Sequence, residues 1–433
     1  MSEGERDVSS GDSHPTIDFD PSTPEHAARW PEAFRDLREK HPRAWTNNQG
    51  GYWLATCYKD VLSIAQGQGV FTAAKMFNPE TGRMEGGINI PSIDSPAFIP
   101  NETDGEAWKA YRQLLNPRFS PKAAEAKRQF ARGVARTLVD RFIESGHCDL
   151  VEDLTSPLPG VFTMELLGLD HGMWLEIADP IHRYSYTLQT DDVAKIGAEI
   201  EEVRRKLGDA LEERRRKPRE DLLSYIANGE VMGRGVTELE ANQMALMLVF
   251  GGLDTTTGLT ACAFHYLGLH PEQRRHLIDH PDQIPVAIEE FVRFFGPIQA
   301  LGRTVTQDTE MDGWSFKKGE RVMIAYAAAN RDPAVFDDPD TLRIDRFPNR
   351  HIGFGGGMHR CLGSFFGRLL IRAMLDEVFA RLPDYRIDTD RAAPYPSVGI
   401  VNGWISIPVT FEPGPKLGGG VPIPEHTLPV HGA

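Results

Sequence analysis

The chain has 433 residues, of which 40% are hydrophobic and 25% charged, as in ordinary soluble globular proteins. Its formal net charge of −15 argues against a nucleic acid or an anionic membrane as partner. The four cysteines are scattered without paired ligand spacing, so neither a disulfide framework nor a zinc site is indicated.

The two ends differ in composition from the rest of the chain. Residues 1–18 are rich in Ser, Gly, Asp and Glu, so we expect disorder there, and this polar, acidic start is not a signal peptide. No linker-like break interrupts residues 19–412, which are predicted to form a single domain. The Pro- and Gly-rich tail, residues 413–433, is predicted to be an extended or mobile arm. The most apolar run, residues 244–250, is too short to span a bilayer, so we expect a soluble, cytoplasmic protein.

The first half of the chain predicts a strand, a long loop and then helices. Residues 51–56 are typical of a strand, and residues 59–66 of a helix. Residues 72–104, called the lid segment below, are rich in Gly and Pro, and a connection of that length usually forms a lid or binding loop. Helices are predicted at 108–115 and over much of 124–214, with breaks at Gly146 and at 157–160.

The second half predicts two prominent helices and several short strands. Residues 237–269 form one long helix that is nearly apolar in its middle and therefore buried on most sides. A second helix, 281–295, stops at Gly296-Pro297. Further predictions are strands at 310–316 and 321–324, an irregular stretch at 330–350, and a hairpin at 400–411. The predicted fold class is mainly α with small β-sheets.

A glycine-rich loop, Phe354-Gly-Gly-Gly-Met-His-Arg-Cys-Leu-Gly363, carries Cys361 into an amphipathic helix. A thiolate at a helix N-terminus is stabilised by the dipole and by free backbone N–H groups, which also tune a sulfur that binds a metal. The glycines would let the backbone approach something large and flat. A buried structural cysteine is the alternative, which the surrounding loop disfavours.

The long helix contains the sequence Phe250-Gly-Gly-Leu-Asp-Thr-Thr-Thr-Gly258. Each glycine costs roughly 1 kcal/mol relative to alanine inside a helix. The threonines can hydrogen-bond to earlier carbonyls and bend the helix. We therefore predict a kink at a place where something binds. Glycines that allow close helix packing are the open alternative.

The spacing Phe354-x-x-Gly357-x-x-x-Cys361-x-Gly363 resembles the haem-thiolate signature of the cytochrome P450 family, and the likeness covers about residues 16–412. It implies the cytochrome P450 fold and haem b, with Cys361 as the axial iron ligand whose thiolate favours O–O cleavage. Gly251-Gly-x-Asp254-Thr255 resembles the family's oxygen-binding groove. There, Thr255 would hydrogen-bond to dioxygen and Asp254 would deliver protons. Within the family, the soluble bacterial camphor hydroxylases are the most similar group.

The same resemblance places cations around the two haem propionates. The candidates are Arg112, Arg303 and His359. Trp108 stands where the family usually has a histidine, and its indole N–H can donate a hydrogen bond without carrying charge. The Glu290-x-x-Arg293 motif, completed by Arg346, resembles the family's structural network behind the haem. An isolated pair at that spacing would otherwise be an ordinary surface ion pair.

The substrate pocket departs from that of the camphor enzyme, because Pro96 replaces a tyrosine that would hold the camphor ketone. The predicted pocket residues are Ile88, Phe98, Tyr184, Tyr186, Met247, Phe250, Gly251, Ile298, Gln299, Val398 and Ile400. Most are apolar, with Gln299 as the single polar handle. The expected substrate is a small or medium apolar molecule such as a terpenoid or a substituted aromatic.

The resemblance implies a monooxygenase that uses O2 and two electrons from a partner. No Gly-x-Gly-x-x-Gly fingerprint follows a strand, so an NAD(P)H-dependent reductase would be a separate chain. Lys109, Arg112 and Arg360 would form a basic patch for an acidic iron–sulfur ferredoxin; a solvated charged face is the alternative. The other functions weighed are a peroxide-driven peroxygenase and a non-catalytic binding protein, both disfavoured by the retained Asp254 and Thr255.

Overall fold

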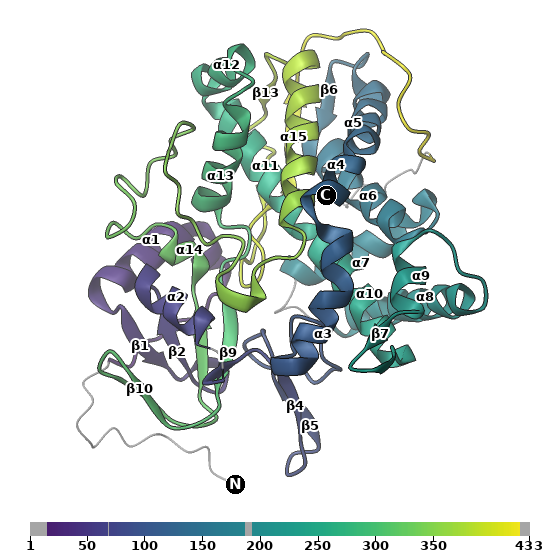
Figure 1. The fold of residues 1–433 in the computed structure, drawn as a ribbon. Helices are drawn as coiled ribbons and strands as arrows, with labels where there is room; N and C mark the ends of the chain where they lie inside the picture. The colour runs from purple at the N-terminus through teal and green to yellow at the C-terminus, as the bar shows by residue number, and fades with distance from the viewer. Residues whose placement is uncertain (1–14, 68, 187–192, 425–433) are drawn as a thin grey trace.

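The computed structural model describes residues 15–67, 69–186 and 193–424 (Figure 1). Its α-helices are α1 (Pro24–Lys40), α2 (Tyr58–Gln66), α3 (Gly105–Leu115), α4 (Pro121–Ala126), α5 (Arg128–Phe142), α6 (Pro157–Leu167), α7 (Trp174–Tyr186), α8 (Val193–Arg216), α9 (Leu222–Ala227), α10 (Glu238–Gly252), α11 (Asp254–Leu269), α12 (Pro271–Asp279), α13 (Ile284–Phe295), α14 (Tyr326–Ala329) and α15 (Ser364–Arg381). Short turns of other helix types are η1 (Asn48–Gly50), η2 (Asn116–Phe119), η3 (Val151–Thr155), η4 (His171–Met173) and η5 (Gly357–His359).

The strands are short and form small sheets. They are β1 (Arg43–Thr46), β2 (Tyr52–Ala55), β3 (Phe71–Thr72), β4 (Lys75–Asn78), β5 (Arg83–Gly86), β6 (His147–Asp149), β7 (Glu230–Val231), β8 (Arg234–Gly235), β9 (Leu301–Val305), β10 (Thr309–Met311), β11 (Trp314–Phe316), β12 (Arg321–Ile324), β13 (Arg386–Ile387), β14 (Ala393–Pro394), β15 (Trp404–Ser406) and β16 (Pro408–Thr410). This mainly helical architecture with small sheets confirms the predicted fold class.

The largest sheet joins two distant parts of the chain in the order β1-β2-β12-β9-β3. Strand β12 runs parallel to β2, with Val322 beside Trp53, and antiparallel to β9. Buried aromatic residues pack on this sheet, where the rings of Trp314 and Phe316 each meet the ring of Trp53 edge-on. The sheet therefore fixes β9, which carries Arg303, against the lid segment.

In the helical part of the protein, α11 and α15 lie between α13 and α5 in the view of Figure 1, and α10, α11 and α15 all contribute residues to one buried apolar cluster. The stretch 238–269 is long and apolar enough to cross a membrane, but 67% of its most apolar window is buried inside the protein. That burial is typical of a core helix. The predicted single helix is divided into α10 and α11 at Leu253, whose backbone angles (φ −89°, ψ −81°) are not helical.

Several sequence-based predictions of local structure need correction. The single strand predicted at 310–316 is the antiparallel pair β10 and β11. The lid segment is not entirely loop, because β4 and β5 form a hairpin within it. Residues 157–160 begin α6 instead of breaking a helix, since Pro157 occupies the first turn, where no N–H is required. The 400–411 hairpin is wrong: β15 pairs with β14, and β16 pairs with β13 and β6. Only Ile407 separates β15 from β16, too short a connection for a hairpin turn.

Both ends of the described chain make backbone contacts with the rest of the protein. Residues 15–18 lay in the segment expected to be disordered, yet Ile17 N–H donates to Trp45 O and Trp45 N–H donates to Pro15 O. The preceding residues lie outside the described part. Residues 413–424 form an extended arm that is docked on α5. Thr137 Oγ1 of α5 donates to Val421 O at 2.7 Å, and Arg141 donates to Ile423 O at 2.7 Å.

Candidate active site

Cys361 lies between the glycine-rich loop and the N-terminus of α15. Its N–H donates to Phe354 O at 2.7 Å, which closes the loop. Cys361 is accessible as a residue, although the surrounding protein desolvates its thiol. Deep burial raises the pKa of the Cys361 thiol, against the opposing effects of the Gly363 N–H and the Arg112 guanidinium. The sulfur is thus directed at a space where an opposing group can bind it.

The loop glycines have two different roles. A Cβ on Gly356 would lie 2.9 Å from Leu62 Cδ1, and one on Gly357 would lie 2.7 Å from Ala65 O. Because both atoms belong to α2, these glycines let the loop pack against that helix. Gly363 has nothing within 4 Å of such a Cβ, so it alone keeps the open approach that the sequence suggested for the set.

The predicted cations converge from three elements near Cys361. Arg112 of α3 donates to Arg360 O at 3.1 Å, and its buried Nε has no hydrogen-bond partner among the described residues. Arg303 of β9 is 2% exposed. Together with His359, Arg303 lines a cavity of about 560 Å³. Trp108 lies beside Arg112 and His359, with ring centroids of Trp108 and His359 5.9 Å apart.

Asp104 is a functional candidate that the sequence reasoning missed. His359 Nε2 lies 2.7 Å from Asp104 Oδ1, and the Thr72 hydroxyl donates to Asp104 Oδ2. Burial would raise the pKa of Asp104, but the hydrogen bonds from His359 and Thr72 lower it below its usual value. The carboxylate therefore fixes the His359 ring. No local motif marks Asp104, which is 255 positions from its partner.

Two polar side chains, Asp254 and Thr255, follow the break between α10 and α11, and they make contacts in different directions. Thr255 Oγ1 donates to Gly251 O at 3.1 Å, the back-bond expected from the sequence. The Asp254 carboxylate is 2% exposed and is held by α7, where it contacts His182 Nδ1 and accepts a hydrogen bond from Ser185. Both α7 partners were missed, because they are ordinary polar residues in an amphipathic helix.

Aromatic side chains gather beside the break. The rings of Phe98 and Phe250 lie 5.3 Å apart, and those of Tyr184 and Phe250 lie 5.9 Å apart. A Cβ on Gly251 would meet only the Met247 methyl group, at 3.6 Å. These predicted pocket residues come from the lid segment, α7 and α10, and the structure brings them together.

The remaining predicted pocket residues lie at the ends of other segments. Ile88 is held at its backbone, where Gly302 N–H donates to its carbonyl at 2.6 Å. Ile298 pairs with Val401, and Gln299 N–H donates to Ile400 O at 3.4 Å. The Gln299 amide donates to Gly296 O at 2.7 Å, while its Oε1 has no partner among the described residues. Two predicted residues lie elsewhere: Val398 packs in a core cluster with Phe19 and Phe34, and Tyr186 stacks on Tyr395, with ring centroids 4.9 Å apart.

Comparison with known proteins identifies the family. Residues 173–383 match the family model "Cytochrome P450". The chain is 32% identical over 386 residues to the steroid C26-monooxygenase of Mycolicibacterium smegmatis, covering 88% of this chain and 92% of that protein. The chain belongs to the cytochrome P450 family. The identification as a soluble bacterial cytochrome P450 from the sequence is confirmed, and as a family member the chain is a haem b monooxygenase.

Other relatives support the same assignment. This cytochrome P450 is 27% identical to the linalool 8-monooxygenase of Pseudomonas putida, over 82% of this chain and 89% of that one. Its fold matches a mutant of P450 EryK solved with erythromycin B, with a TM-score of 0.81 and 27% identity over 92% of this chain and 99% of that chain. The named relatives act on chemically different molecules, so family membership leaves the substrate open.

The residues around Cys361 fit haem b. The accessible Cys361 suits an axial iron ligand, and the partly buried Arg112 and the buried Arg303 carry positive charge that two propionates would neutralise. The buried Arg112 Nε without a partner is a donor that such an acceptor would satisfy.

The structural network predicted behind the haem of this cytochrome P450 is formed. Glu290 and Arg293 have fully buried side chains and share two hydrogen bonds, of 2.7 and 2.8 Å. Arg346 Nε lies 3.1 Å from both Glu290 carboxylate oxygens. Arg293 also donates to the carbonyls of Asn330 and Pro339. The network ties α13 to the irregular segment that leads to the cysteine loop.

Proposed function

We propose that this cytochrome P450 hydroxylates a small or medium apolar substrate, such as a terpenoid or a substituted aromatic, in the cytoplasm. The substrate C–H, one O2, two electrons and two protons give the alcohol and one water. The observation that carries this proposal is the ring cluster of Phe98, Phe250 and Tyr184 beside Gly251, since apolar surface of this kind binds apolar molecules.

We propose that Cys361 is the axial ligand and that Arg112, Trp108, Arg303 and His359 hold the propionates. When bound, the haem supplies activation of O2 and insertion of one oxygen atom into the substrate. Bidentate or paired N–H groups from arginine hold carboxylates well, and the indole N–H of Trp108 adds a neutral donor. Asp104 would orient His359 for this contact, through the 2.7 Å hydrogen bond between them.

Proton delivery is assigned to Asp254 and Thr255. A carboxylate can give a proton, and a hydroxyl next to it can place that proton at the reacting oxygen. Successive helical residues point in different directions, so Asp254 must turn from α7 before its proton reaches the Thr255 side. The non-helical Leu253 directly before Asp254 leaves that turn less constrained.

The two electrons are proposed to come from an acidic iron–sulfur ferredoxin that a separate NAD(P)H-dependent reductase reduces. Lys109 and Arg360 are exposed, and Arg112 links α3 to the cysteine loop through Arg360 O. These residues support the basic patch expected from the sequence, on a chain of net charge −15. Opposite charge on a partner would speed its approach to this patch.

The decisive experiment is a screen of apolar compounds for the absorption change that accompanies displacement of water from ferric haem. Terpene alcohols, substituted aromatics and steroids form its three arms, because the relatives named above include a steroid and a linalool monooxygenase. Binding by terpenoids or small aromatics, followed by an oxygenated product with a surrogate ferredoxin, supports the proposal. Binding by steroids alone contradicts the substrate class. Product formed equally fast from hydrogen peroxide without electrons would instead support the peroxygenase alternative.

A further inference from the structure

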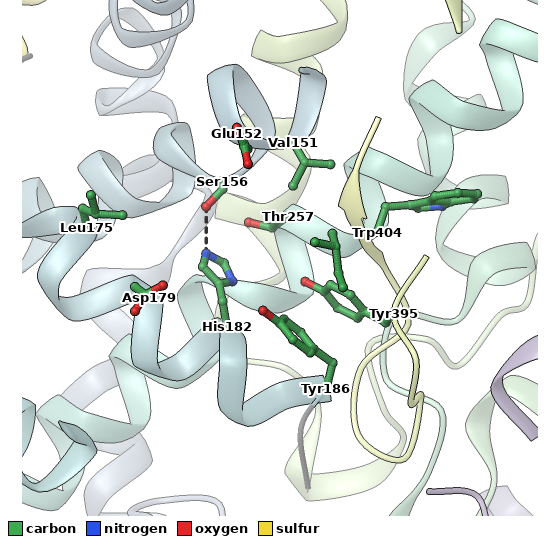
Figure 2. A pocket seen from close by; sticks show the side chains of 11 residues that line it. Val151, Glu152, Ser156, Leu175, Asp179, His182, Tyr186, Thr257, Tyr395 and Trp404 are labelled. Carbon is green, nitrogen blue, oxygen red and sulfur yellow. Dashed lines mark hydrogen bonds between the residues drawn. The ribbon is translucent and has the colours of Figure 1, made fainter. Parts of the chain in front are cut away.

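His182 of α7 joins the buried Asp254 to an open pocket at the protein surface. Its Nδ1 contacts Asp254 Oδ1, and its Nε2 lies 2.8 Å from Ser156 Oγ, as Figure 2 shows for the second contact. Ser156 and His182 both line this pocket, with Glu152, Tyr186 and Tyr395 around them. Ser156, His182 and Asp254 thus form a chain of contacts from the pocket to the buried carboxylate.

The side chains become more buried from His182 to Asp254, as expected for a path that carries protons inward. The Asp254 side chain is 2% exposed and that of His182 is 15% exposed. Burial disfavours the charged form of His182, but the carboxylates of Asp254 and Asp179 outweigh it and raise the pKa of the ring. The other titratable groups facing the pocket are Glu152 on η3, Tyr186 on α7 and Tyr395 in the segment before β15. Burial raises the pKa of Tyr186 to about 12, so it stays neutral.

We propose that His182 is the proton donor that recharges Asp254 during turnover, with Ser156 as the positioning residue that aims its ring. This inference rests on the proposed role of Asp254. The N–H bond at Nδ1 breaks, an O–H bond forms on the Asp254 carboxylate, and the ring becomes neutral. Water of the pocket then returns a proton to the ring. Each passage moves one proton inward without moving electrons, and two passages supply the two protons of one turnover.

The same three residue types, in this order, also occur in hydrolases, where a serine attacks an ester or amide. That activity needs backbone N–H groups at the serine to stabilise the oxyanion. Here the Ser156 N–H is donated to Val151 O, and Pro157 and Pro159 have no N–H. At these three positions of the described chain no free N–H is offered to an oxyanion, and proton transfer is the chemistry that the arrangement supports.

The first test measures the His182 ring directly, independently of turnover. The histidine nitrogens of the full chain are labelled with nitrogen-15 and titrated by NMR in the diamagnetic ferrous carbon-monoxide form. We expect His182 to stay protonated to higher pH in the wild type than in Asp254→Asn, and Ser156→Ala to change its nitrogen shifts. An identical titration in wild type and Asp254→Asn would overturn the proposal.

The second test follows turnover with a substrate found by the spectral screen. His182→Gln should lower product formed per electron by about tenfold, raise the solvent deuterium isotope effect and change the pH profile. His265→Gln is the matched control, because His265 lies on α11 stacked against Trp404, with ring centroids 3.8 Å apart. Unchanged coupling and isotope effect in His182→Gln would refute the relay while leaving the monooxygenase assignment intact. Failure of the wild type to oxidise any screened compound would instead refute the proposed substrate class.

Discussion

Lys75 and Glu102 form an ion pair inside the lid segment, with Nζ and Oε2 3.2 Å apart and both side chains fully buried. Glu102 also accepts hydrogen bonds from the N–H groups of Ile88 and Phe98, at 3.0 and 2.9 Å. A single carboxylate thus holds both ends of the lid segment. Phe98 belongs to the aromatic cluster of the proposed pocket, so the pair also sets the position of a substrate contact.

Glu102→Gln should therefore weaken both stability and ligand binding. Breaking a buried ion pair from one side costs about 3–5 kcal/mol, since the remaining Lys75 charge stays buried without its partner. We expect a lower urea midpoint and weaker binding of ligands from the spectral screen. Glu80→Gln, at an exposed position of the β4–β5 hairpin, is the control and should change neither. Unchanged ligand binding in Glu102→Gln would show that the ion pair does not position the substrate contact at Phe98.

Thr255→Ala should keep haem and substrate binding but divert electrons to hydrogen peroxide. The hydroxyl that would place the proton is lost, and product per electron should fall by about tenfold. Thr260→Ala provides the control, because Thr260 makes the same back-bond, to Thr256 O at 2.7 Å, in the buried part of α11. Peroxide and product are measured against NAD(P)H consumed. Normal coupling in Thr255→Ala would contradict the assigned proton delivery.

Glu290→Gln should destabilise the fold by about 3–5 kcal/mol, because it leaves Arg293 and Arg346 buried without a carboxylate. The protein should also retain less haem, since the network supports the segment leading to Cys361. Chemical denaturation and haem content per chain measure the two effects. Asp376→Asn removes the partly exposed Arg372–Asp376 pair of α15 and should change stability by less than about 1 kcal/mol. Equal losses in the two variants would argue against a special role for the buried network.

Stability should depend on pH through Glu289. Burial would raise the pKa of Glu289, but Arg368 and His351 hydrogen-bond to its carboxylate and lower the pKa to about 2. Because the pKa of Glu289 is lower in the folded protein, its carboxylate stabilises the folded state. This stabilisation is complete above the unfolded-state pKa of about 4.3 and is lost as the pH falls through about 2. Glu289→Gln should thus destabilise by about 3 kcal/mol at pH 6 and by less than about 1 kcal/mol near pH 2.5, as measured by urea unfolding. A pH-independent difference would contradict this linkage.

Lys109→Glu should slow reduction by an acidic ferredoxin and flatten its dependence on salt, because it reverses one charge of the proposed docking patch. Stopped-flow reduction at several ionic strengths measures the effect. Lys318→Glu, an exposed lysine next to β12, is the control of equal charge change. The same salt dependence in wild type and Lys109→Glu would exclude this docking surface.

The sequence predicted the parts of the site that are encoded locally. The loop around Cys361 and the break at Leu253 depend on glycines and threonines within a few positions, and both could be read without a structure. The Glu290 network was predicted from the family resemblance, since the spacing of Glu290 and Arg293 alone would equally suit a surface ion pair. For Lys109 and Arg112, helical spacing alone placed both residues on α3.

Contacts between distant segments could not be predicted in the same way. The partners of Asp254 lie on α7, where nothing in the sequence marks His182 or Ser185 as facing inward. Asp104 and His359 meet only because the lid segment returns to the cysteine loop. The error in the 400–411 region has the same origin, since β16 takes its partners from β6 and β13. Alternating apolar residues do not specify which distant strand they will join.

The docked C-terminal arm limits where the chain can be shortened, or joined to another protein, without loss of stabilising contacts. Ending the chain at residue 412 would deprive Asp140 of the Leu417 and Gly418 N–H groups and Arg381 of the Pro415 carbonyl. Helices α5 and α15 would then lose the strap that lies across them. A reporter or a reductase joined beyond residue 424 would be tethered at the α5 surface. The length of any linker should be chosen from that point of attachment.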